Sequence, residues 1–190
     1  MTSSPRLKPV QKTVPTKLSN GSGFTLIEIL IALVIFSIGL LGLAGMQLRG
    51  TDGTNMAYFR SQATLIANDM AERLHANRDG AYIANAYSAT GVCGTAPTPF
   101  CATRGSTPGS SCTPAEMAAF DLYTLACSID GTNGTKALLP SGTLTVVCND
   151  YDTADADACT AGSPHTITVT WNEISEGKRQ PSDVTLVVLP

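Results

Sequence analysis

The sequence predicts an α+β fold, in which a long N-terminal helix packs on a small antiparallel sheet with disulfide-stapled loops. The first half of that helix is expected to cross a membrane. Three observations lead to this fold. Residues 29–48 carry no charged side chain. A helical period of apolar residues follows from Asn55. Runs rich in Val, Thr, Ile and Leu lie near the end of the chain, at 142–148, 166–171 and 183–189.

The N-terminal segment has the charge distribution of a membrane-inserted chain. As a helix, residues 29–48 would extend roughly 30 Å, the thickness of the hydrocarbon core. Residues 1–23 form a basic leader without any acid, which should stay cytoplasmic; its charges are Arg6, Lys8, Lys12 and Lys17. We therefore expect a single pass through a membrane, with everything after Leu48 on the side opposite the cytoplasm.

Beyond the membrane the helix becomes amphipathic. We expect it to run from about Phe24 to Asn77, with a membrane half at 24–48 and an amphipathic half at 49–79. Asp69 and Arg73 stand four residues apart in the order that favours an ion pair on a helix. The face expected to pack on the head is formed by Phe59, Ala63, Ile66, Met70 and Leu74.

The globular head is expected at 80–190. Residues 80–112 are rich in Gly, Ala, Pro, Ser and Thr and are predicted to form a loop. A capping box at Thr113–Glu116 predicts a short helix to about Ala126. The last two of the three strands should form a hairpin with Lys178 and Arg179 at its tip.

Six cysteines lie in the second half of the chain. Their even number in a loop-rich region favours up to three disulfides formed in an oxidising compartment. Buried free thiols are the alternative, and the sequence alone does not select the pairing. Cys148–Cys159 is the favoured pair because it closes a short loop after a strand. Zinc is disfavoured because there is no C-x-x-C pair, and His75 and His165 are distant from any cysteine pair. The candidates are Cys93, Cys101, Cys112, Cys127, Cys148 and Cys159.

The loop between Cys148 and Cys159 is acidic. Its carboxylates could bind calcium if the loop folded inward, although the EF-hand spacing is missing and a solvated loop is favoured. Beyond its leader, the chain carries a net negative charge, so we expect no nucleic-acid partner. The weak calcium candidates are Asp150, Asp152, Asp155 and Asp157.

Glu28 is the residue that an ordinary membrane segment does not explain. A carboxylate at the start of an apolar helix is costly in lipid. A secretory signal peptide cleaved after Ala44 leaves this acid without a purpose, and so does a plain membrane anchor. Cleavage between Gly23 and Phe24 would instead create an amine on Phe24, in the same or a neighbouring chain, that can pair with Glu28.

The stretch Gly23-Phe24-Thr25-Leu26-Ile27-Glu28, followed by an apolar helix, resembles the prepilin motif of type IV pilins and of type II secretion pseudopilins. The resemblance implies that a prepilin peptidase cleaves after Gly23 and methylates the amine of Phe24. It also implies that Glu28 is the carboxylate needed for methylation or for ordered entry into the filament.

Several further segments resemble those of PilV-type minor pilins, whereas nothing comparable is found for residues 80–142. The resemblance implies a minor pilin in the priming or tip complex of a type IV pilus, supporting twitching motility and adhesion. Its partners would be other minor pilins, the major pilin, the prepilin peptidase and the inner-membrane assembly machinery. A type II secretion pseudopilin and a secreted binding protein are the alternatives. The similar segments are Ile38–Leu48, Tyr58–Thr64, Asp69–Arg73, Ile167–Trp171 and Val184–Val188.

The sequence offers no pattern typical of a catalyst. There is no P-loop, no nucleophile elbow, no H-E-x-x-H motif and no pairing of Cys with His that suggests a nucleophile. We therefore expect a structural subunit without a catalytic site, a cofactor or a resident metal ion.

Overall fold

The computed structural model describes residues 23–190 except 84, 131–133, 153, 155–156 and 176–177. The chain divides into two compact units, Met1–Gly45 and Met46–Pro190. Helix α1 (Leu26–Ala76) begins in the first unit and continues into the second. Its start lies two residues later, and its end one residue earlier, than the sequence predicts.

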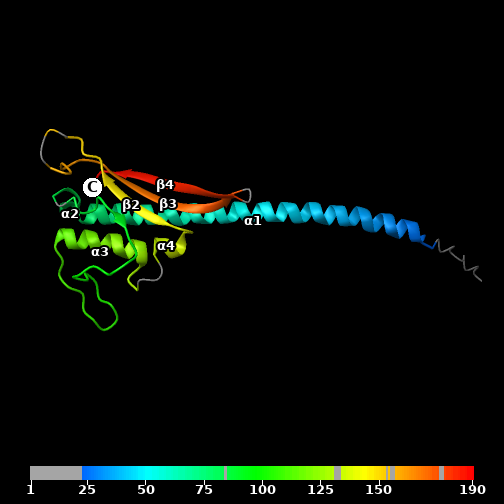
Figure 1. Cartoon of the computed structure of the whole chain (residues 1–190), viewed down its shortest axis with the longest axis horizontal. Coiled ribbons are helices and arrows are strands. Elements are labelled where there is room, and N and C mark those ends of the chain that lie inside the picture. Colours follow the sequence, from blue (N-terminus) through cyan, green and yellow to red (C-terminus); the bar gives the residue numbers. More distant parts are fainter. Residues whose placement is uncertain (1–22, 84, 131–133, 153, 155–156, 176–177) are drawn as a thin grey trace, which may run out of the picture. The chain divides into compact units, whose positions relative to one another are not determined.

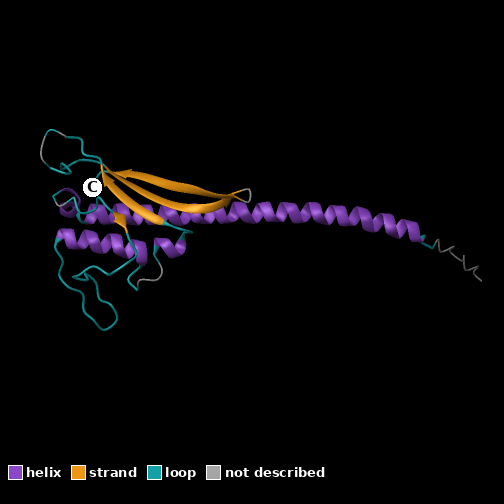
Figure 2. Cartoon of the chain, viewed as in Figure 1, coloured by secondary structure: helices purple, strands orange, loops and turns teal. Residues whose placement is uncertain are grey.

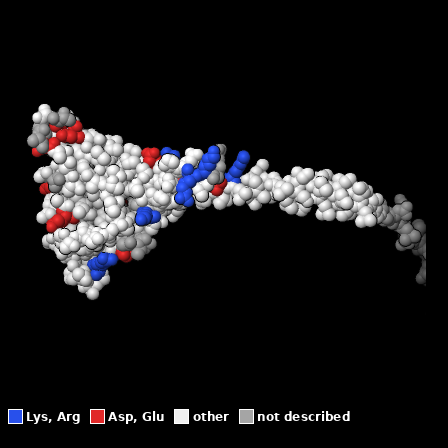
Figure 3. Space-filling view, in the orientation of Figure 1, with Lys and Arg blue, Asp and Glu red and all other residues white. Residues whose placement is uncertain are grey.

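The described part of the first unit is an exposed apolar helix. Every residue from 23 to 45 is exposed, and the most apolar window of α1 has a mean hydropathy of 2.7. By length and composition, α1 can therefore cross a membrane. The surface over residues 29–48 is free of charge (Figure 3). Such a surface requires lipid or neighbouring apolar helices around it.

The second unit begins with the amphipathic part of α1, whose predicted packing face is confirmed. Phe59 lies half-buried at the start of this face and packs against the core. The helix stays continuous through Gly50 and Gly53. Its buried residues are Ala63, Ile66, Ala67, Met70, Ala71 and Leu74.

The sheet has four antiparallel strands in the order β1-β2-β3-β4. The three predicted strands are confirmed, and the last two are longer than expected. A two-residue strand, β1, adds to the side of β2 and was not predicted. The bounds are Thr90–Gly91 for β1, Thr143–Cys148 for β2, His165–Ser175 for β3 and Lys178–Val188 for β4.

The prediction that Lys178 and Arg179 form the hairpin tip was wrong. Both residues belong to β4, where Lys178 pairs with Ser175 and Arg179 with Ile174. The two strands stay paired through their polar ends as far as Ser175 and Lys178; residues 176–177 lie outside the described residues.

Three further helices complete the head. Helix α3 (Pro114–Cys127) has the predicted capping box, because the Thr113 hydroxyl accepts from the backbone of Glu116 and the Glu116 carboxylate accepts from the backbone of Thr113. Helices α2 (Arg78–Tyr82) and α4 (Thr135–Leu138) were not predicted. The prediction of a loop over 80–112 is thus corrected at both α2 and β1.

The core lies between the sheet and the helices (Figure 2). Leu144 and Val146 of β2 and Ile167 and Val169 of β3 alternate onto the face that packs against α1. Their neighbours on the opposite face are mainly threonines, as the period of a half-buried strand requires. A helix on one face of a small antiparallel sheet is the predicted α+β arrangement.

Candidate assembly motif and disulfide-closed head

The predicted cleavage site lies in an open, non-helical segment. Residues 23–25 have no regular secondary structure, and the Phe24 side chain is 79% exposed. Among the described residues, apart from its chain neighbours, no atom lies within 4 Å of where a Cβ on Gly23 would stand. The Gly23–Phe24 bond therefore lies in an exposed segment before the helix begins.

Thr25 defines where the helix begins. The Glu28 N–H donates to the Thr25 hydroxyl at 3.3 Å and to the Thr25 carbonyl at 3.1 Å. Threonine followed three residues later by glutamate is the pattern of a capping box. Glu28 therefore stands in the first turn of α1, where the helix dipole favours a negative charge. Its side chain is exposed and free to meet a cation from another chain.

All six cysteines are joined in three disulfides. Cys148 pairs with Cys159, the pair that the sequence favoured. The structure contains no free cysteine, contrary to the alternative of buried thiols. The other two bonds tie the loop before α3 to itself and to the end of that helix: Cys101–Cys112 and Cys93–Cys127.

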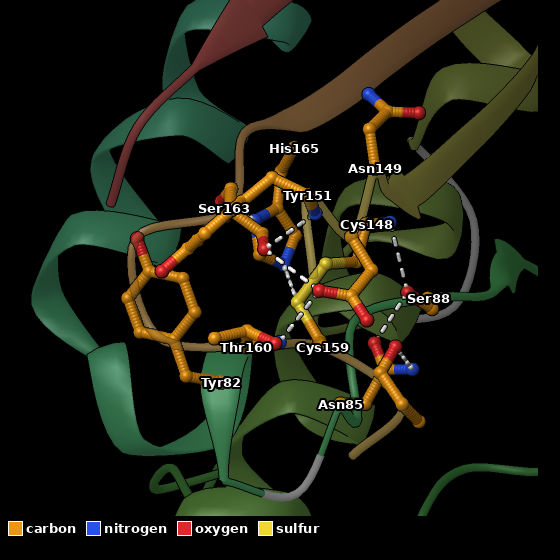
Figure 4. Close-up of a disulfide and its surroundings, with 12 residues drawn as sticks. Tyr82, Asn85, Ser88, Cys148, Asn149, Tyr151, Cys159, Thr160, Ser163 and His165 are labelled. Atoms are coloured by element: carbon orange, nitrogen blue, oxygen red, sulfur yellow. Dashed lines mark hydrogen bonds between the residues drawn. A yellow bond between two sulfur atoms is a disulfide. The ribbon is translucent and has the colours of Figure 1, made fainter. Parts of the chain in front are cut away.

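The sequence predicted that His165 lies far from any cysteine pair, and this prediction was wrong. Figure 4 shows the imidazole against the Cys148–Cys159 bond, with its Nε2 atom 3.7 Å from Cys159 Sγ. His165 is fully buried, and burial lowers its pKa. Donor atoms of Cys148, Cys159 and His165 lie within 4.8 Å of one another. A cysteine binds zinc only as a thiolate, however, and the Cys148–Cys159 disulfide supplies none.

The acidic loop is held together by hydrogen bonds to the carboxylate of Asp150, one of its own residues. One oxygen of Asp150 accepts from the backbone of Thr160 at 3.1 Å and from the Ser163 hydroxyl at 3.1 Å. Hydrogen bonds from Thr160, and then from Asp152 and Ser163, lower the pKa of Asp150.

The other calcium candidates do not converge on Asp150 in the described residues. Asp152 caps the backbone N–H of Ala154 at 3.0 Å, and Asp157 is exposed. Asp155 lies outside the described residues. Among those described, the loop's carboxylates form no group that could hold a metal ion. This geometry favours a hydrogen-bonded loop over a calcium ligand set.

A polar network joins α1 to α3 inside the head. The predicted Asp69–Arg73 pair forms at 2.9 Å. The same arginine also donates to Asp121 at 2.9 Å, and Asp121 accepts from the Tyr87 hydroxyl. Burial, followed by the hydrogen bond to Asp121, raises the pKa of Tyr87, so its phenol remains a donor. Sequence reasoning missed Asp121, although an acid inside the apolar run of α3 signals a buried partner.

The Cys148–Cys159 bond gives a direct stability test. Replacing both residues with serine should lower the free energy of unfolding of the head by about 3 kcal/mol, because the open chain gains entropy. Non-reducing peptide mapping should find the three pairs, and denaturant titration should measure the loss. Full alkylation of all six cysteines in unreduced native protein would contradict the disulfide assignment.

Comparisons with known protein families agree with the N-terminal motif and the fold described above. Residues 18–44 match the model of the prokaryotic N-terminal methylation motif. Residues 45–123 match the Tt1218-like model, described as type IV pilin Tt1218. No curated protein and no solved structure matches the chain. The two family matches adjoin at residues 44 and 45, and together with the apolar helix, antiparallel sheet and disulfides they show that this chain is a type IV pilin-like prepilin.

Proposed function

We propose that the chain is a minor pilin of the PilV type that helps to start or cap a type IV pilus, and so supports twitching motility and adhesion. The observation that carries this proposal is the exposed Gly23–Phe24 bond directly before the capped start of an apolar helix bearing Glu28. The pilin family supplies the assembly role, which is structural rather than enzymatic.

In this proposal, each segment of the chain has its own role before and after assembly. The leader, 1–23, is removed by the prepilin peptidase, and Phe24 is N-methylated. The stretch 24–48 holds the subunit in the inner membrane and later packs in the filament. The amphipathic stretch 49–79 and the head, 80–190, face the periplasm before assembly and the cell surface afterwards. Other minor pilins, the major pilin and the assembly machinery are the partners.

An ordinary signal peptide is less well supported. Signal peptidase would have to cut after Ala44, in the middle of a stretch where α1 is continuous from Leu26 to Ala76. A peptide bond inside a helix is not extended and has its backbone groups engaged. The Gly23–Phe24 bond lies outside the helix.

The test is the location of the wild-type chain in its native host. Pili sheared from cells should contain the subunit in a small amount relative to the major pilin, and deletion of the gene should reduce surface pili. A subunit found only in the culture medium, without pili, would contradict the proposal. An abundance equal to that of the major pilin would contradict its minor status.

A further inference from the structure

Strand β4 leaves one long edge of the sheet without a partner. It is the outermost strand, and its register is shared with β3 alone. In an antiparallel strand, every second residue points its N–H and C=O groups away from the neighbour it pairs with. Along the described part of the head, no other strand receives these groups. Such an edge is a template for an additional strand.

The two halves of this edge are protected differently. The first half carries charges and a proline, which are devices that prevent edge pairing; they are Lys178, Arg179, Pro181 and Asp183. The second half, Val184–Val188, has no charge and no proline. The chain thus blocks pairing along the hairpin end of β4 and leaves it open along the other end.

The open half is also held in place as a rigid strand. Val184, Leu186 and Val188 pack against the core from the inner face. Just beyond the strand, the Tyr82 hydroxyl donates to the carbonyl oxygen of Pro190 at 2.8 Å. On the outer face, Val187 is 60% exposed. A partner strand would therefore meet a preformed template beside an exposed apolar side chain, with little ordering cost.

On the other side of the sheet, β1 is only two residues long, and the edge of β2 is already covered. Strand β1 pairs with Leu144 and Thr145 of β2. Next to it, the Val146 N–H donates to the Ala89 carbonyl at 3.0 Å, and the Cys148 N–H donates to the Ser88 hydroxyl at 3.0 Å. A second copy of the chain cannot offer this edge to β4 without displacing residues 88–91.

The direction of β4 argues against pairing with its own copy. Arg179 shares a groove with Asp52 and Met56 of α1, whereas Pro190 reaches Tyr82, past the end of α1. Strand β4 therefore runs in the direction of α1. An antiparallel β4–β4 pair would point the two α1 helices in opposite directions, which subunits anchored in one membrane cannot do.

A parallel pair of two copies is also unsuitable as a closed dimer. In a parallel ladder, a residue that bonds across the pair stands opposite one whose backbone groups point away. Two identical edges therefore cannot meet on an exact two-fold axis, the symmetry that most homodimers use.

We propose that Val184–Val188 binds an extended strand from the head of a different pilin subunit, which adds to the sheet beside β4. The inference rests on the proposed assembly role and deepens it. Because β4 has a single outer edge, each copy makes this contact once. The contact joins two unlike subunits and does not propagate along a filament, which suits a subunit of low abundance.

Two lysine substitutions test the proposal in full-length protein in the native host. Val187→Lys places a charge beside the open edge. Val147→Lys is the matched control, because Val147 lies in the same row of the sheet, across Thr166, and is also exposed. The two variants should have the same melting temperature of the head. We expect Val187→Lys to lower incorporation into sheared pili by roughly tenfold relative to Val147→Lys.

Photo-crosslinking identifies the partner. With p-benzoylphenylalanine at position 187, the crosslinked peptide should come from a strand of another protein that carries a prepilin motif, and position 147 should not give that product. Crosslinking to a second copy of this chain, to a protein without the motif, or equally from both positions would overturn the inference. So would equal incorporation of the two lysine variants. Absence of the wild-type chain from pili would instead overturn the proposed function.

Discussion

Glu28→Ala is expected to give a stable membrane protein that no longer enters pili. The substitution removes a charge from the start of the apolar helix, so membrane insertion should not suffer. In the filament base, the amine of Phe24 would lose its partner. An uncompensated buried charge costs about 3–5 kcal/mol, which is on the order of a hundredfold or more in incorporation. Immunoblots of membrane and sheared-pilus fractions from a complemented deletion strain measure the effect.

Two controls separate the charge from other effects. Glu28→Gln should fail like Glu28→Ala, because the amide keeps the shape and loses the charge. Asp52→Ala removes an exposed acid from the same helix, beyond the apolar stretch, and should assemble normally. Normal piliation with both Glu28 variants would show that this carboxylate has no assembly role.

Asp121→Ala should be the most damaging single substitution among the polar residues of the head. Asp121 is 6% exposed and accepts from both Arg73 and the buried Tyr87. Its loss leaves both donors without this acceptor, at a cost of about 3 kcal/mol, since Arg73 keeps Asp69 and part of its hydration. For a head of this size, the melting temperature should fall by roughly 6–12 °C.

Asp69→Ala is the matched control for that result. It removes a carboxylate from the same arginine at the same distance of 2.9 Å, but from an exposed position on the helix surface. Exposed pairs of this kind contribute about 0.3–0.5 kcal/mol. Equal losses in the two variants, measured by denaturant titration, would show that the buried network is not what joins α1 to α3.

The elements that the sequence predicted have strong local signals. Helix α1 has an uncharged stretch and then a regular apolar period, and α3 has a capping box with proline at its first turn. The paired strands were found from their β-branched residues. Their extension through Asn172–Ser175 and Lys178–Ser182 was missed, because pairing between the two strands, rather than local composition, maintains these polar ends.

What the sequence missed depends on tertiary contacts. Strand β1 is two residues long and exists only through its pairing with β2. Helix α4 starts where a Cβ on Gly134 would stand 2.2 Å from the backbone of Ala126, a close approach that only the fold reveals. Likewise, the contact of His165 with the Cys148–Cys159 bond joins residues whose closeness depends on the register of β2 and β3. The motif at Gly23–Glu28, by contrast, is local and was readable directly.

The mature N-terminus distinguishes a processed prepilin from a protein with an ordinary signal peptide. Protein purified from membranes of the native host would be examined by intact mass and by mass spectrometry of its N-terminal peptide. We expect a chain that begins at Phe24 with one methyl group on its amine and three disulfides. A chain that begins at Gly45, without the methyl group, would contradict the pilin role and indicate an ordinary secretory signal.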